Sequence, residues 1–222
     1  MSDNHESAET ELKSDLFGRI MRVEHDGERW TRRDTTAARP WARPIARWLA
    51  RREARALLHA DGMAGLPALL GWDGATLERS WIEGQPMQQA RPVDPGYYRQ
   101  ALTLLRRLHR AGITHNDLAK EANWLVTPDG SPALVDFQLA WCLAKRGAVF
   151  RMLAREDLRH LLKHKRNYIP EKLTRRQIGI LETPAWPARA WTATGKRMYL
   201  FVTRKILRWQ DREGANDRQF GK

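Results

Sequence analysis

The chain has 222 residues, of which 42% are hydrophobic and 29% are charged, and its formal net charge is +13. Ten tryptophans and a near-average apolar fraction exclude wholesale disorder, and the length suits one large domain or two small lobes. No stretch approaches about 18 consecutive apolar residues, so we expect no membrane-spanning helix. The polar start lacks the apolar segment of a secretory signal, and the single cysteine, Cys142, excludes an intrachain disulfide. These features predict a cytoplasmic protein.

The positive charge is distributed unevenly along the chain. Residues 1–141 contain 19 basic and 19 acidic side chains, whereas residues 142–222 contain 20 basic and 7 acidic ones. The second stretch therefore holds the whole excess. A surface of this kind attracts nucleic acid, anionic lipid or an acidic partner, but it can also serve only to keep a protein in solution.

The first elements are predicted from turn and helix signals. Residues 1–15 are expected to form a disordered tail. Residues 18–36 predict a β-hairpin, because two alternating segments flank the turn His25-Asp26-Gly27. A helix is expected from Pro44 to Ala60, where Asp61-Gly62 ends it.

The rest of the chain changes from strands to helices. Its predicted elements are short strands within residues 65–74 and 75–84, a helix from Pro95 to Arg110, short strands around residues 124–126 and 133–135, and helices after Val149 with interruptions near Pro170, Pro184 and Pro187. This order, strands first and helices later, predicts an α+β fold.

The candidate catalytic and metal-binding residues lie between Leu108 and Ala140. Asp117 lies in a loop, Asn123 precedes one strand of the predicted hairpin, and Asp136 follows the returning strand. Asn123 and Asp136 should therefore lie at the same end of the hairpin. Amide and carboxylate oxygens are ligands for Mg²⁺, and a second carboxylate remains for a substrate hydroxyl. These parts are those that phosphoryl transfer needs.

Two motifs resemble those of protein kinases. His115-Asn116-Asp117-Leu118 resembles the kinase catalytic loop, and Asp136-Phe137-Gln138 resembles the metal-binding Asp-Phe-Gly motif. The 13 residues from Asn123 to Asp136 agree with that family, and Ser80–Gly84 (SWIEG) resembles the hinge that reads adenine through backbone groups. The resemblance covers roughly residues 18–166. It implies a two-lobed protein-kinase-like fold, with the N-lobe and hinge over residues 16–84 and an abbreviated, mostly helical C-lobe over residues 85–222.

The resemblance also implies roles for single residues. Asp117 would orient or deprotonate the acceptor hydroxyl, and Lys120 would lie near the γ-phosphate of ATP. Asn123 and Asp136 would hold Mg²⁺ on the nucleotide phosphates, and Glu83 in the hinge segment would belong to the nucleotide site. The alternative is that the polar residues of these loops are only turn formers.

Glu53 interrupts the apolar stripe of the helix predicted over residues 44–60, a stripe that includes Ile45 and Leu49. A carboxylate on a buried face is costly unless it is paired, although a surface position with partial burial is the alternative. In the kinase fold the matching helix carries a Glu that pairs with a strand lysine over the phosphates. This sequence has no lysine between Lys13 and Lys120, so Arg33 takes the aligned position and would pair with Glu53.

Other differences from the protein-kinase motifs indicate which kinase families the chain resembles most. The nucleotide-covering G-x-G-x-x-G loop is absent, Asn116 replaces the usual Arg, and Gln138 replaces the Gly. The short chain is similar to the small bacterial RIO-type and Kdo/WaaP lipopolysaccharide kinases. The resemblance leaves two acceptors open, a protein Ser/Thr hydroxyl and a lipopolysaccharide sugar hydroxyl at the inner membrane. A pseudokinase that acts as a nucleotide-binding or scaffolding module is the alternative from a different functional class.

The remaining aromatic and metal-ligand residues suggest structural roles. Seven histidines without ligand spacing and one cysteine argue against zinc. We expect Trp124 and Trp141 to belong to the core, with ligand stacking as the alternative. Residues 196–212 predict a basic amphipathic helix, which either packs against the domain or lies on an anionic membrane.

Overall fold

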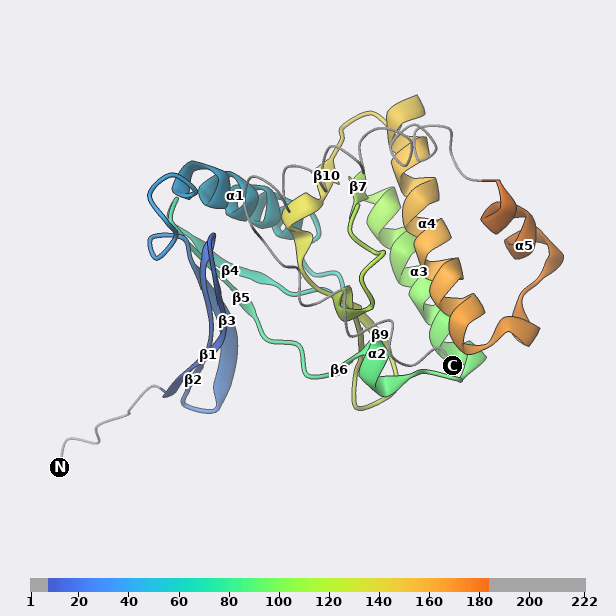
Figure 1. Cartoon of the computed structure of the whole chain (residues 1–222), viewed down its shortest axis with the longest axis horizontal. Coiled ribbons are helices and arrows are strands. Elements are labelled where there is room, and N and C mark those ends of the chain that lie inside the picture. The colour runs from blue at the N-terminus through green and yellow to red at the C-terminus, as the bar shows by residue number, and fades with distance from the viewer. Residues whose placement is uncertain (1–7, 184–222) are drawn as a thin grey trace, which may run out of the picture. The chain divides into compact units, whose positions relative to one another are not determined.

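The computed structural model describes residues 8–183, which form a mixed α+β structure with antiparallel strand pairing (Figure 1). Among the described residues, 8–181 belong to one compact unit. The predicted α+β class is confirmed. The basic helix predicted over residues 196–212 lies outside the described residues.

A five-stranded antiparallel sheet forms the first part of this unit, with the strand order β1-β2-β3-β5-β4 (Figure 1). Its strands are β1 (Ala8–Asp15), β2 (Gly18–His25), β3 (Glu28–Asp34), β4 (Leu69–Trp72) and β5 (Thr76–Ser80). The hairpin of β2 and β3 confirms the predicted one, and Asp26 and Gly27 in its turn both have positive φ. Such turns match the right-handed twist of the flanking strands.

The prediction of a disordered tail over residues 1–15 is wrong for residues 8–15, because β1 pairs with β2 along its length. All eight side chains of β1 are exposed. The strand therefore has no buried face and no hydrophobic alternation that could reveal it in the sequence. Residues 1–7 lie outside the described part of the chain.

Helix α1 (Arg43–His59) lies beside β4 and β5, and it also approaches residues 137–142 (Figure 1). Its bounds agree with the predicted helix to within one residue. The expected apolar stripe through Ile45 is wrong, because Ile45 is 48% exposed. The buried face is instead centred on Ala46, Ala50, Glu53 and Leu57. Small alanines let the helix approach the sheet closely, and Ile45 is turned away from it.

The second part of the unit is mostly helical. Its helices and strands are β6 (Gln85–Pro86), α2 (Met87–Ala90), α3 (Pro95–Arg110), β7 (Ile113–Thr114), β8 (Trp124–Val126), β9 (Pro132–Leu134), β10 (Trp141–Cys142), α4 (Ala148–Tyr168) and α5 (Arg175–Glu182), with 3₁₀ turns η1 (Glu121–Asn123), η2 (Phe137–Leu139) and η3 (Pro170–Lys172). Helix α3 has the predicted bounds. It begins after Asp94, whose side chain caps the helix by accepting a hydrogen bond from the Gly96 amide at 2.8 Å. None of the helices in residues 8–183 combines the length and apolar character that crossing a bilayer requires.

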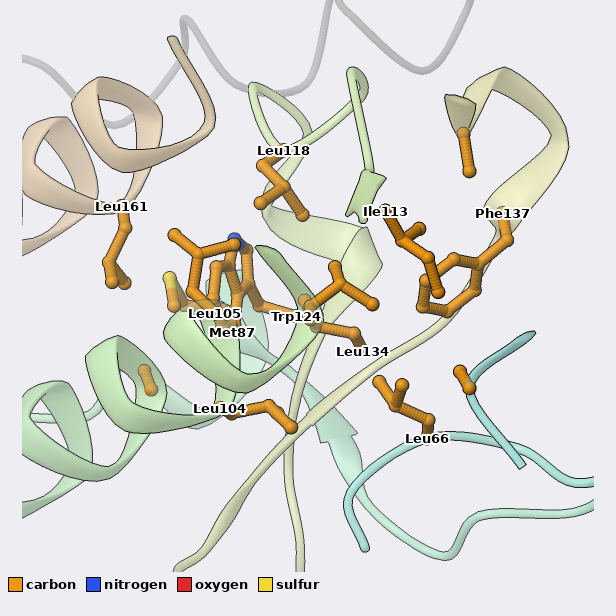
Figure 2. Packing of buried hydrophobic residues seen from close by; sticks show 14 of the residues in the cluster. Leu66, Met87, Leu104, Leu105, Ile113, Leu118, Trp124, Leu134, Phe137 and Leu161 are labelled. Atoms are coloured by element: carbon orange, nitrogen blue, oxygen red, sulfur yellow. The ribbon is translucent and has the colours of Figure 1, made fainter. Parts of the chain in front are cut away.

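The main hydrophobic core anchors the loops that carry the candidate site residues. Figure 2 shows Leu118, Trp124 and Phe137 packed in this core, and all three side chains are fully buried. Each of them directly follows a candidate residue, namely Asp117, Asn123 or Asp136. The expectation for Trp124 is confirmed, whereas Trp141 is 44% exposed and the expectation that it belongs to the core is wrong.

Candidate active site

The hairpin of β8 and β9 brings Asn123 and Asp136 to the same end of its ladder. Trp124 pairs with Leu134, and the Val135 amide donates to the Asn123 carbonyl at 3.1 Å. Asp136 then leaves the ladder with φ of 65°, a left-handed conformation that Asp and Asn tolerate better than most residues. The predicted placement of these two residues is confirmed.

Asp117 is held by two neighbouring side chains. The Asn123 side-chain amide donates to the Asp117 carbonyl at 2.9 Å and to its carboxylate at 3.0 Å. The ammonium of Lys120 lies 2.9 Å from the same carboxylate oxygen, Oδ2. Because the nitrogen of the Asn123 amide makes these bonds, its oxygen is the atom that could coordinate a cation. The structure thus brings together Asp117, Lys120 and Asn123, as expected.

Asp136 lies in an electropositive environment. Burial alone would raise the pKa of Asp136, but the positive charge of Arg33 and a hydrogen bond from Gln138 at 2.6 Å outweigh this effect. Arg79 and Lys120 act in the same direction. The pKa of Asp136 therefore lies below its ordinary value, and the group is an ionised carboxylate near neutral pH.

Glu53 is fully buried between two arginines from adjacent strands. Its carboxylate oxygens lie 3.6 Å from Nε of Arg33 on β3 and 3.3 Å from Nε of Arg79 on β5. These contacts are ion pairs without hydrogen-bond geometry, because neither Glu53 oxygen has a hydrogen-bond partner among the described residues. The predicted pairing of Arg33 with Glu53 is confirmed.

Arg79 is a residue of the cluster that the sequence analysis missed. In the sheet Arg79 stands opposite Thr31, and Leu77 stands opposite Arg33. Opposite residues of an antiparallel pair share a face, so Arg79 projects to the same side as Arg33 and the buried Leu77. The alternation of Leu77 and Arg79 along β5 was the available signal.

Asp157 on α4 is the second residue that the sequence analysis missed. Its carboxylate accepts hydrogen bonds from the backbone amides of His115 at 2.8 Å and Asn116 at 2.9 Å. His109 Nε2 lies 3.1 Å from the same carboxylate. Asp157 is 1% exposed and lies seven residues after the buried Phe150, so a carboxylate on an apolar helix face was the signal. It fixes the backbone of the loop that carries Asp117.

Glu83 is not part of this cluster. Its carboxylate pairs with Arg29 at 2.8 Å and accepts a hydrogen bond from the Trp81 indole at 3.1 Å. The first contact joins the segment after β5 to β3, and the second lies within that segment. Among the contacts of the described residues, none joins Glu83 to Asp117 or Asp136.

The donor set bears on which metal could bind. No group of three or more His, Cys, Asp or Glu side chains within residues 8–183 is arranged to hold a metal ion. Magnesium bound to a nucleotide needs only one or two protein carboxylates, because phosphates and waters complete its shell. The ionised Asp136 and the amide oxygen of Asn123 fit such a nucleotide-bound ion. They do not fit a metal held by protein ligands alone.

Three cavities of the described residues lie away from Asp117, Asn123 and Asp136. Their volumes are about 680, 580 and 530 Å³, and other residues line them. The candidate site itself is a cluster of charged and polar side chains. Its three carboxylates, those of Glu53, Asp117 and Asp136, interact with three cations, those of Arg33, Arg79 and Lys120.

No protein-family model matches the chain, and no curated protein matches it significantly.

Proposed function

We propose that the chain is an ATP- and Mg²⁺-dependent phosphotransferase with a two-lobed protein-kinase-like fold. It would transfer the γ-phosphate of ATP to a hydroxyl of a protein or of a lipopolysaccharide sugar. The observation that carries the proposal is that the ionised Asp136 lies at the same end of the β8–β9 hairpin as Asn123, whose side-chain amide donates to Asp117. Phosphoryl transfer needs little more than positioned carboxylates and compensating cations.

Each side chain has a distinct role in this proposal. Asp136 and Asn123 hold Mg²⁺, which when bound neutralises charge on the nucleotide phosphates. Asp117 accepts a hydrogen bond from the acceptor hydroxyl and orients its oxygen. Lys120, which pairs with Asp117, supplies positive charge next to the transferred group.

Arg33 and Arg79 take the place of the usual lysine. A guanidinium binds carboxylate and phosphate equally well in its planar fork, so both arginines can hold Glu53 and approach phosphate oxygens. The positive charges of both arginines also lower the pKa of Asp136, the proposed metal ligand. Asp157 positions the loop of Asp117 without contact with the reactants.

A pseudokinase is the second candidate, and the same arginines favour it. Arg33 and Arg79 carry two positive charges, which Glu53 and Asp136 balance without any ligand. A cluster balanced in this way can bind a nucleotide through its phosphates and lack the geometry for transfer. Turnover separates the two functions.

The test is transfer of label from γ-labelled ATP by the full chain, with Mg²⁺ and either a protein acceptor mixture or lipopolysaccharide. We expect label in one acceptor and a loss of roughly 10²–10⁴-fold in Asp117→Asn. Asp61→Asn, an exposed turn substitution, is the matched control and should transfer at the wild-type rate. Transfer by Asp117→Asn at the wild-type rate would reject the assigned role. ATP binding without transfer to any acceptor would favour the pseudokinase.

A further inference from the structure

The exposed face of α1 carries a row of arginines without acidic neighbours. Arg43, Arg47, Arg51 and Arg55 follow one another at intervals of four residues, and all four are exposed. Glu53 is the only acidic residue of the helix, and it is buried. In the part of the chain that the structure describes, the ion pairs of α1 are those of Glu53. The arginine row therefore presents uncompensated positive charge to its surroundings.

Large apolar side chains flank this row. Trp41 is 54% exposed, Ile45 is 48% exposed and Trp48 is 54% exposed. Trp41 lies in the turn before α1, and Ile45 and Trp48 are three residues apart, which places these two on one side of the helix. The guanidinium of Arg52 lies 4.6 Å from the ring centre of Trp48 and 5.9 Å from that of the exposed Trp141. The aromatic surface thus extends from α1 to β10, and we call it, together with the arginine row, the α1 face.

A groove of about 530 Å³ continues the α1 face toward β4. Trp48, Leu58 and Trp72 give it apolar walls, and Arg51 and Arg55 stand at its rim. Leu58 is 63% exposed, so this apolar wall of the groove is open to solvent. An apolar hollow with a cationic rim has the chemistry to receive an anionic amphiphile.

The side chains of the α1 face indicate which kind of partner it binds: a membrane, a single-stranded nucleic acid or a second copy of the chain. Tryptophans with aliphatic residues and arginines are typical of helices that lie in a bilayer interface, where arginines pair with lipid phosphates and apolar groups enter the acyl boundary. Single-stranded nucleic acid would use ring stacking and phosphate contacts, but it would gain nothing from Ile45 and Leu58. Arg52 also covers one face of the Trp48 ring. A second copy related by a two-fold axis would place arginine row against arginine row.

We propose that the α1 face docks the protein onto an anionic membrane surface. This inference goes beyond the proposed function, since none of the site residues takes part in it. It predicts peripheral binding through electrostatic attraction and shallow insertion of Trp41, Ile45 and Trp48. Binding should weaken as salt rises, because salt screens exposed charges.

Sedimentation of the full chain with vesicles tests the proposal. The wild type should bind phosphatidylcholine vesicles that contain phosphatidylglycerol and not vesicles of phosphatidylcholine alone. The variant Arg47→Gln/Arg51→Gln/Arg55→Gln should lower the partition coefficient roughly 100-fold, which is about fivefold for each charge near the surface. The matched control, Arg99→Gln/Arg106→Gln/Arg107→Gln, removes the same charge from exposed positions on α3 and should bind nearly as the wild type does.

A second measurement, tryptophan fluorescence quenching, uses variants that keep the charge of the protein. Vesicles with brominated anionic lipid should quench the tryptophan fluorescence of the wild type, and Trp41→Phe/Trp48→Phe should remove most of this quenching while the protein still binds. Equal losses of binding in the two arginine variants would overturn the proposal, because net charge would then explain the attraction. So would preference for RNA over vesicles at equal salt, or a dimer that the α1 variant dissociates.

Discussion

Nε of Arg33 lies 3.6 Å from the carboxylate of Glu53, and both side chains are buried between the five-stranded sheet and α1. A second arginine, Arg79, completes the environment of the same carboxylate at 3.3 Å. Buried charges are tolerated only when they are paired, so removal of one partner leaves a charge in a medium that solvates it poorly. This arrangement makes the pair a structural requirement as well as a candidate phosphate site.

Arg33→Ala should therefore lower the free energy of unfolding by about 1–3 kcal/mol, since Arg79 remains as a partner for Glu53. Arg33→Lys keeps a cation and should lower it less. Urea denaturation measures both effects. The matched control is Arg32→Ala, because the adjacent Arg32 points to the other face of β3 and forms part-exposed pairs with Glu9 and Glu78. Its effect should stay below about 1 kcal/mol, and an effect as large as that of Arg33→Ala would contradict the assignment.

Asp157→Ala should destabilise the loop that carries Asp117. The substitution removes the acceptor of two backbone amides, those of His115 and Asn116, and should lower the free energy of unfolding by about 1–3 kcal/mol. Hydrogen exchange of these two amides should accelerate more than that of α3. Glu171→Ala, an exposed acid in η3, is the control and should leave both measurements unchanged. Unaltered exchange at His115 and Asn116 in Asp157→Ala would show that other contacts hold the loop.

The stability of the fold should fall with acid between about pH 6.5 and pH 4 because of His160. Burial, together with the charge of Lys163, lowers the pKa of His160 to about 4 in the folded state. In the unfolded chain the pKa is near 6.5, so the unfolded state binds the proton first as pH decreases. Stability due to the neutral imidazole is complete above about pH 6.5, is lost progressively toward pH 4, and does not change further below it.

His160→Gln should flatten this part of the pH profile of the melting temperature. The control is His25→Gln, because His25 lies at the exposed end of the β2–β3 hairpin. A profile that is equally steep in wild type and His160→Gln would assign the acid sensitivity to another group.

Local signals account for what the sequence predicted correctly. Asp26-Gly27 specifies a tight turn whatever lies around it, so the β2–β3 hairpin could be read directly. The same holds for α3, which has Asp94 before it and Gly112 after it. Asn123 and Asp136 could be placed at one end of a hairpin because strand pairing is antiparallel across a short turn.

Most of the failures share one physical cause, which is dependence on a partner distant in sequence, but strand β1 was missed for a different reason. Strand β1 exists through its backbone pairing with β2, and no buried side chain records that pairing. Ile45 fits a helical apolar stripe, but the sheet selects the alanine face of α1 instead. Asp157 is buried on a helix face that also carries Phe150 and Leu161, and the partly buried Arg79 lies two residues from the buried Leu77 on the same face of β5. A polar residue that interrupts an apolar pattern can therefore indicate a site even when the other residues of that site are distant in sequence.

The last prediction concerns the metal dependence of nucleotide binding at Asp136. If Asp136 and Asn123 hold Mg²⁺ on the phosphates, ATP with Mg²⁺ should raise the melting temperature of the wild type more than ATP with EDTA does. The reason is linkage, since a ligand stabilises the folded state according to its affinity. In Asp136→Ala the two increases should be equal, because the ionised carboxylate that would bind the metal is absent.

Asp61→Asn is the control for this experiment, and it should keep the full difference between Mg²⁺ and EDTA. The melting temperature without nucleotide also matters, because Asp136 offsets the charge of Arg33 and Arg79, so Asp136→Ala should itself be less stable than the wild type. The comparison must therefore be the increase that ATP causes within each variant. An ATP-dependent increase in the wild type that EDTA does not reduce would place the nucleotide on the arginines alone, and it would favour the pseudokinase over the phosphotransferase.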